Sequence, residues 1–182
     1  MKWAPQAAGL LLAALPILAS AAGAVVCHDG GRYRVVARPT DATGTDFLVQ
    51  RRGPGDDRRA CSYMPRPGDL EIRNENAEYF LALRGSKLLL DSGTAPEPRG
   101  LIIWDLDKRA KVYAGTYSSP YRIDRTGISF WMPSGEATET QCPQAARWQA
   151  QGLGVALETQ ARLTLADLKL VLSQVVRCSP RQ

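Results

Sequence analysis

Histidine is almost absent from this chain. The 182 residues include only His28, and the four cysteines contain no C-x-x-C pair. Zinc sites and thioredoxin-type redox sites need clustered histidines or closely spaced cysteines, so we expect neither a metal site nor a cofactor. A single histidine also leaves no His-dependent catalytic triad unless His28 is itself the base. We expect His28 to be a surface residue near the mature N-terminus.

A long apolar run is missing too. The longest stretch, 7–19, is shorter than the about 20 residues that span a membrane, and Pro16 interrupts it. Lys2 precedes this stretch, and the Ala-Gly-Ala sequence at 22–24 offers small residues at the −3 and −1 positions of a cleavage site. This arrangement predicts a signal peptide at 1–24 and no membrane span once it is removed.

The predicted leader places residues 25–182 outside the cytoplasm, either in the periplasm or secreted. A lipoprotein is the alternative, because Cys27 lies close to the cleavage region, but the branched Val26 before it is not the small residue that lipoprotein peptidases prefer. A chain of this length forms one domain that can bury roughly 70% of its unfolded surface. We therefore expect a single domain that disulfides reinforce.

Four cysteines in an oxidising compartment are expected to pair. They allow three connectivities. The simplest joins neighbours along the chain, Cys27 with Cys61 and Cys142 with Cys178.

The sequence contains no cluster of only basic or only acidic residues. The formal net charge is +5, but acidic residues are scattered among the basic ones. Nucleic-acid binding depends on a basic patch that releases counterions. We therefore expect no nucleic acid among the partners.

Short runs of apolar and β-branched residues alternate with turn residues along most of the chain. The breaks recur about every 10 to 15 residues, which favours a mainly β domain, an antiparallel meander closed as a sandwich or barrel. The strands are expected at 32–38, 47–49, 70–72, 79–83, 88–90, 101–104, 112–117 and 128–132. The turns are expected at 53–55, 85–86, 105–109, 119–120 and 125–127, and a loop at 93–100.

The C-terminal segment 164–177 fits two periods. Thr164 with Asp167 resembles a capping pair, and the apolar residues at 165, 168, 172 and 175 share one helical face. Leu168, Leu170 and Leu172 also alternate as in a strand. The sequence leaves a C-terminal helix and a strand equally open.

One segment is similar to a catalytic motif. Residues 88–93, Leu-Leu-Leu-Asp-Ser-Gly, resemble the apolar–Asp–Ser/Thr–Gly motif of aspartic peptidases. The resemblance implies that Asp91 is one of two carboxylates that share a proton and activate water, with a homodimer supplying the second. The alternative, which we expect, is a turn in which Asp91 accepts hydrogen bonds from the backbone of Gly93 or Thr94.

Aromatic and arginine side chains cluster between residues 99 and 131. Such residues are enriched at binding surfaces and at stacking sites for sugars. The candidates for binding a protein or glycan are Arg99, Trp104, Tyr117, Tyr121 and Trp131. The expected function is an exported, non-enzymatic binding domain. The alternatives are a hydrolase using Asp91 and a lysozyme inhibitor, since small exported disulfide-bearing inhibitors are similar in general build.

Overall fold

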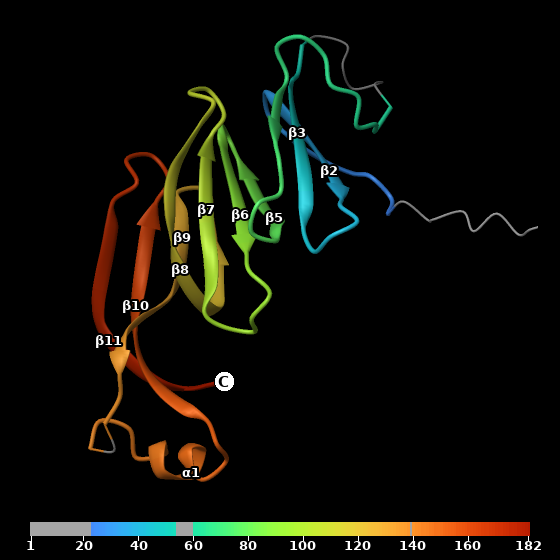
Figure 1. Ribbon diagram of the computed structural model, residues 1–182. Coiled ribbons are helices and arrows are strands. Elements are labelled where there is room, and N and C mark those ends of the chain that lie inside the picture. Colours follow the sequence, from blue (N-terminus) through green and yellow to red (C-terminus); the bar gives the residue numbers. More distant parts are fainter. Residues whose placement is uncertain (1–22, 54–59, 139) are drawn as a thin grey trace, which may run out of the picture.

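The computed structural model describes residues 23–53, 60–138 and 140–182, and these form two antiparallel sheets with one short helix (Figure 1). The mainly β fold expected from the sequence is confirmed, and the arrangement is that of a sandwich. Residues 1–22 of the leader predicted at 1–24, and most of the turn expected at 53–55, lie outside the described residues.

The N-terminal sheet is a four-stranded meander in the order β1-β2-β3-β4. Both faces of β2 and β3 carry buried apolar residues. Val36 and Leu48 lie on one face. The other face joins the core through Tyr33, Val35, Ala37, Phe47 and Val49. The strands are β1 (Val26–Gly30), β2 (Tyr33–Pro39), β3 (Thr45–Arg51) and β4 (Leu70–Ile72).

The second sheet has seven strands in the order β11-β10-β9-β8-β7-β6-β5, so it is also a meander. Figure 1 shows β5–β7 between the four-stranded sheet and strands β8–β11. The strands are β5 (Glu78–Arg84), β6 (Lys87–Ser92), β7 (Arg99–Asp105), β8 (Ala110–Ile123), β9 (Gly127–Glu136), β10 (Gly154–Thr164) and β11 (Leu170–Arg181).

Strand β8 changes partner along its length. Its first part pairs with β7 up to Tyr117, and its second part pairs with β9, with a register shift between Ser118 and Arg122. The expected turn at Ser119–Pro120 is therefore wrong, because both residues lie inside β8. The shift is where the seven-stranded sheet bends, and Pro120 is compatible with it because Pro is tolerated where ladder pairing is interrupted.

Two apolar clusters lie on opposite faces of β6 and β7. The first joins the four-stranded sheet to residues such as Leu88, Leu90 and Ile102. The second brings Leu89 and Ile103 together with Phe130 of β9 and Leu163 of β10. Strands that are three places apart in a flat sheet would be about 14 Å apart, so the seven-stranded sheet must curve around the second cluster. Strands β6 and β7 are thus covered on both faces.

The C-terminal segment forms a strand, not a helix. Strand β10 ends at Thr164, a turn follows in which Leu168 has a φ of 57°, and β11 begins at Leu170. The segment is a strand because β11 pairs with β10. The periodicity of the segment itself does not reveal this pairing. The only helix in the described part of the chain is α1 (Ala145–Gln149), which the sequence did not predict.

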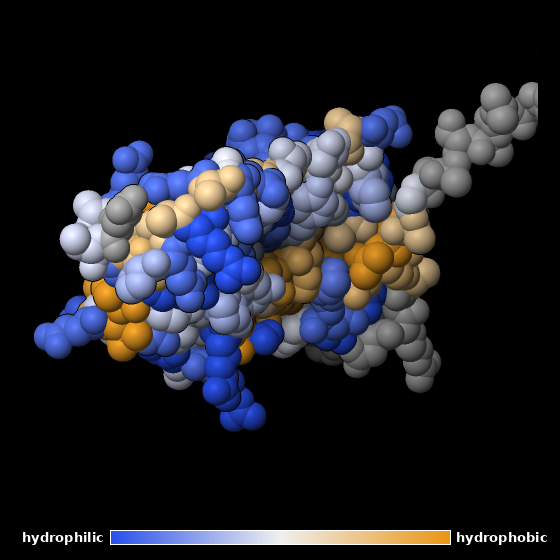
Figure 2. Space-filling view, turned by 90° about the horizontal axis from the view of Figure 1, so that it is seen from below, coloured by the Kyte–Doolittle hydropathy of each residue, from blue (hydrophilic) through white to orange (hydrophobic). Residues whose placement is uncertain are grey.

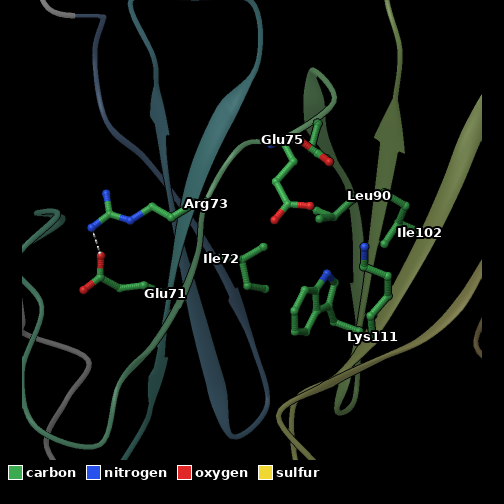
Figure 3. Close-up of a pocket in the computed structure, with 9 residues that line it drawn as sticks. Glu71, Ile72, Arg73, Glu75, Leu90, Ile102 and Lys111 are labelled. Carbon is green, nitrogen blue, oxygen red and sulfur yellow. Dashed lines mark hydrogen bonds and ion pairs between the residues drawn. The ribbon is translucent and has the colours of Figure 1, made fainter.

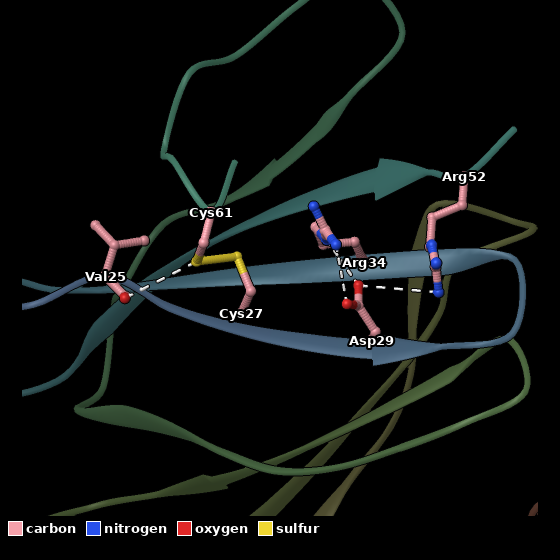
Figure 4. The surroundings of a disulfide bond; sticks show 6 residues. All are labelled: Val25, Cys27, Asp29, Arg34, Arg52 and Cys61. Carbon is pink, nitrogen blue, oxygen red and sulfur yellow. Dashed lines mark hydrogen bonds and ion pairs between the residues drawn. A yellow bond between two sulfur atoms is a disulfide. The ribbon is translucent and has the colours of Figure 1, made fainter. Parts of the chain in front are cut away.

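Both predicted disulfides are present. Cys27 of β1 pairs with Cys61, and Cys142 pairs with Cys178 of β11, each with a Cα–Cα distance of 5.8 Å. Figure 4 shows the first bridge tying β1 to the chain after β3, close to the ion pair between Asp29 and Arg34 at 2.6 Å. The second bridge lies in a small apolar cluster with α1. No helix of the described residues is long and apolar enough to cross a membrane.

Candidate functional site

Asp91 lies within β6 rather than in a turn, so the expected turn geometry is wrong. Its carboxylate accepts hydrogen bonds from Arg99 Nε at 3.0 Å and from the Tyr117 hydroxyl at 2.7 Å. The backbone N–H of Gly93 donates to the carbonyls of Asn76 and Ala77 instead. Cross-strand pairing explains the difference, because Asp91 pairs with Leu101 of β7 and so stays in the ladder.

Three more of the predicted binding residues gather near the bend of β8. Tyr117 is buried in the second apolar cluster, and Tyr121 packs edge-on against it with ring centroids 5.4 Å apart. Burial and the hydrogen bond to Asp91 raise the pKa of Tyr117 well above its usual range. Trp131 lies under the guanidinium of Arg177, 4.4 Å from the ring centroid.

A buried carboxylate completes this group. Glu158 is fully buried, Arg177 Nε lies 2.6 Å from its Oε2, and Arg181 donates to its Oε1. Burial alone would raise the pKa of Glu158, but hydrogen bonds from Ser118 and Arg177 and the arginine charges lower it. Both carboxylates are held by arginine, and these contacts account for them as structural groups. Asp91 links β6 to β7 and β8, and Glu158 with Arg181 links β10 to β11 and to Ser118 of β8.

Trp104 lies elsewhere, in a pocket of ≈ 280 Å³ where the two sheets meet. We call this the Trp104 pocket. Figure 3 shows β4 on one side, contributing Ile72, and Leu90, Ile102 and Lys111 on the other side. The lining residues are Glu71, Ile72, Arg73, Glu75, Glu78, Leu90, Ile102, Trp104 and Lys111.

The pocket has an apolar floor because it is the open end of the first core cluster. Trp104 is partly buried against that cluster, and Leu90 and Ile102 belong to it. Trp104 pairs across the ladder with Lys111 of β8, so the two side chains lie on the same face of the sheet. The indole and the ammonium therefore border the pocket together.

Some charged groups of the pocket are already engaged. Glu78 is buried and its Oε2 accepts the backbone N–H groups of Glu75 and Asn76, both at 2.8 Å, so this carboxylate holds the turn before β5. Glu71 and Arg73 form an ion pair that points away from Ile72 (Figure 3).

Two charged groups of the pocket remain available. The side chains of Glu75 and Lys111 are exposed and make no salt bridge with any residue that the structure describes. An acceptor, a donor and an indole thus border one apolar hollow. Such a site can hold a small polar ligand that has one apolar face.

Sequence reasoning identified Trp104 but not its neighbours. Glu75 lies in the turn before β5 and Lys111 on β8, 36 residues apart in the sequence. Neither belongs to a motif, and only the packing of β4 against the seven-stranded sheet brings them together. No local signal would have found them.

His28 is not the surface residue that the sequence led us to expect. It is partly buried, and its ring stacks on Phe80 of β5 with centroids 3.5 Å apart and an interplanar angle of 3°. Burial lowers the pKa of His28, while the nearby Asp29 opposes this. The histidine therefore connects the edges of the two sheets.

Comparison with known proteins gives no relative. No family model matches the chain, and neither a curated protein nor a solved structure matches it.

Proposed function

We propose that this protein is an exported, non-enzymatic binding domain that holds a sugar residue of a glycan in the Trp104 pocket. The observation that carries the proposal is the combination of a partly buried indole with two charged side chains, Glu75 and Lys111, that have no ionic partner among the described residues. The floor beneath them is apolar and preformed by the core.

The chemistry of a sugar ring matches this combination. One face of a pyranose carries C–H groups, which pack on an aromatic ring, and its edges carry hydroxyls that both donate and accept hydrogen bonds. A carboxylate accepts and an ammonium donates, so Glu75 and Lys111 are suited to hydroxyls on two sides of one ring. A cavity of ≈ 280 Å³ is near the lower end of ligand pockets, and a single sugar unit suits that size.

Export is part of the proposal. The leader predicted at 1–24 supports it, and so do the two disulfides, which persist in oxidising compartments such as the bacterial periplasm or the extracellular space. A hydrolase acting through Asp91 has less support, because Arg99 and Tyr117 both hydrogen-bond to that carboxylate.

The first experiment is an NMR titration of ¹⁵N-labelled protein with trimers of N-acetylglucosamine, glucose and mannose. The indole N–H signal of Trp104 should shift with at least one trimer, while those of Trp131 and Trp148 should stay in place. If no trimer moves the Trp104 signal, or if the signals of Trp104, Trp131 and Trp148 shift together, the proposal is wrong.

Matched variants then separate binding from folding. Trp104→Phe keeps an aromatic ring in the core but shortens the platform, and it should weaken binding by about tenfold, the loss of roughly 1.4 kcal/mol. Glu75→Gln and Lys111→Met should each weaken it by a similar factor. The controls are Trp131→Phe and Glu136→Gln, which lie outside the pocket and should leave the affinity unchanged.

A further inference from the structure

Three turns meet at one end of the seven-stranded sheet and surround a hollow of ≈ 490 Å³. They are the turns that follow β5, β8 and β10, and Figure 1 places this end of the sheet at the top, opposite the C-terminus. We call the hollow the arginine pocket. Its lining residues are Arg84, Gly85, Ser86, Lys87, Arg125, Thr126, Leu165 and Ala166.

The floor of the arginine pocket is apolar because it is the open end of the second core cluster. Leu165 is only 5% exposed and belongs to that cluster together with Ala82 of β5. Arg84 lies two residues beyond Ala82, so its side chain leaves β5 on the same face of the sheet. Ala166 follows Leu165 and is exposed. The pocket thus combines an apolar base with a charged rim.

Two arginines at the rim have no acidic partner. Arg84 and Arg125 are exposed, and neither makes a salt bridge with any residue in the ranges 23–53, 60–138 and 140–182. Arg84 donates to the carbonyl oxygen of Leu83 at 2.9 Å, and most of its N–H donors remain available. None of the described residues that line the pocket is acidic.

Acidic residues do lie in or beside these turns, but each has a base that offsets it. The pairs are Asp105 with Lys87 at 2.7 Å, Asp107 with Arg32 at 2.9 Å, Asp124 with Arg162 at 3.0 Å, and Asp167 with Lys169. Because the charges within these pairs cancel, the positive charges of Arg84 and Arg125 remain at the pocket.

At the opposite end of the sheet, where β7 begins and β11 ends, the arginines of those strands are neutralised. Arg99 pairs with Asp91, and Arg181 pairs with the buried Glu158. Figure 2 views the molecule from this end and shows hydrophilic and apolar residues intermixed on its surface. Arg84 and Arg125 therefore differ from the arginines that hold the strands of the sheet together.

The charge and geometry of two free guanidinium groups indicate the ligand. A single guanidinium fork matches the two oxygens of a carboxylate. A phosphate monoester carries about two negative charges at neutral pH and three strong acceptor oxygens, so it can accept hydrogen bonds from two forks at once. A sulfate ester has three such oxygens but only one charge. The apolar floor suits the organic part of an ester.

We propose that the arginine pocket binds a small organic phosphate. Its phosphate monoester group lies between Arg84 and Arg125, and its organic part packs on Leu165 and Ala166. The volume of ≈ 490 Å³ is within the range of small-molecule sites, which favours a free ligand over a lipid headgroup. The proposal does not depend on sugar binding at the Trp104 pocket, because the two pockets share no lining residue.

Isothermal titration calorimetry with phenyl phosphate and phenyl sulfate tests the proposal, because the two esters share a ring and differ in charge. Phenyl phosphate should bind, and phenyl sulfate should bind at least about tenfold more weakly. Arg84→Gln and Arg125→Gln should each weaken phenyl phosphate binding by at least about tenfold, because each removes charge-assisted hydrogen bonds. Both residues are exposed, so the variants should keep the Tm of the wild type.

Two control variants remove the same charge elsewhere. Arg147→Gln changes an exposed residue of α1, and Lys111→Met changes the Trp104 pocket, so both should leave phenyl phosphate binding unchanged. An absence of phenyl phosphate binding, equal binding of the two esters, or glutamine variants at Arg84 and Arg125 that bind as tightly as the wild type would each overturn the proposal.

Vesicle sedimentation distinguishes a free phosphate ester from a lipid headgroup that presents the same group. Phosphatidylcholine vesicles that contain phosphatidic acid should retain no more protein than vesicles of phosphatidylcholine alone. Retention that requires phosphatidic acid and is lost in Arg84→Gln would overturn the assignment to a free ligand.

Discussion

Strands β6 and β11 each contain a run of three apolar residues, but the two runs have opposite surroundings. Leu88, Leu89 and Leu90 in β6 are all fully buried, whereas Leu170, Val171 and Leu172 in β11 are 36% to 52% exposed. The difference lies in position: β6 is inside the sheet with an apolar cluster on each face, and β11 is at the edge. An apolar triplet is therefore a core element or an exposed surface depending on what the fold places beside it.

The largest expected effect comes from substitution in β6. Leu89→Ala should lower the free energy of unfolding by about 2 to 5 kcal/mol, because it removes a fully buried side chain and leaves a cavity in the second cluster. Leu172→Ala should change it by less than about 1 kcal/mol, since the side chain is half exposed. Urea denaturation at low protein concentration measures both. Equal losses would mean that β11 is part of the core.

The second-largest expected effect concerns the second half of β11, which contains Arg177, Pro180, Arg181 and the disulfide-bonded Cys178. Replacing Cys142 and Cys178 together by serine should cost about 2 to 4 kcal/mol, mainly by releasing the constraint on the unfolded chain. Thermal unfolding with and without the pair measures the loss. The Leu170–Leu172 half pairs with Leu163–Ala161 independently of the bridge, so its amides should exchange in the folded variant as they do in the wild type. Faster exchange there in the variant would show that both halves of β11 depend on the disulfide.

The smallest expected effect concerns β1, which is an edge strand like β11 but is covered. The edge strand β1 is covered by the stacking of His28 on Phe80, and burial lowers the pKa of His28. Above the ordinary histidine pKa of about 6.5 the ring is neutral in both the folded and the unfolded chain, so pH has no effect through this residue. Below it, the unfolded chain takes up the proton first, and stability falls until the pH passes the folded pKa.

The prediction is a drop in stability as the pH falls from about 7 toward 5. His28→Phe keeps a stacked ring without the titration, so the part of the drop that is due to His28 should be missing in that variant. Urea midpoints at several pH values test this. Identical pH profiles for the two proteins would show that His28 does not contribute.

Much of the fold follows from the sequence, because local signals agree there. The strands at 32–38, 70–72, 101–104 and 128–132 are apolar or alternating and end at turn residues. The cysteine pairing followed from proximity along the chain. The bend in β8 was mistaken for a turn, because Ser119–Pro120 has the composition of one.

The remaining features depend on contacts between distant segments. Most of residues 164–177 form a strand because they pair with β10. Strand β10 contains many polar residues, so the sequence did not predict it. Of the candidate site, Trp104 was predicted as an aromatic residue in a cluster, but Glu75 and Lys111 join it only through the packing of the two sheets. Four other candidates, Arg99, Tyr117, Tyr121 and Trp131, proved to lie near the bend of β8.

The central claim is that position separates the buried triplet Leu88–Leu90 of β6 from the exposed triplet Leu170–Leu172 of β11. Native-state hydrogen exchange tests it most directly. The amides of Leu88–Leu90 should be protected to a high degree, as expected for core strands. Those of Leu170–Leu172 should exchange much faster, as expected for a strand at the edge of the sheet. Equal protection of the two triplets would contradict the account.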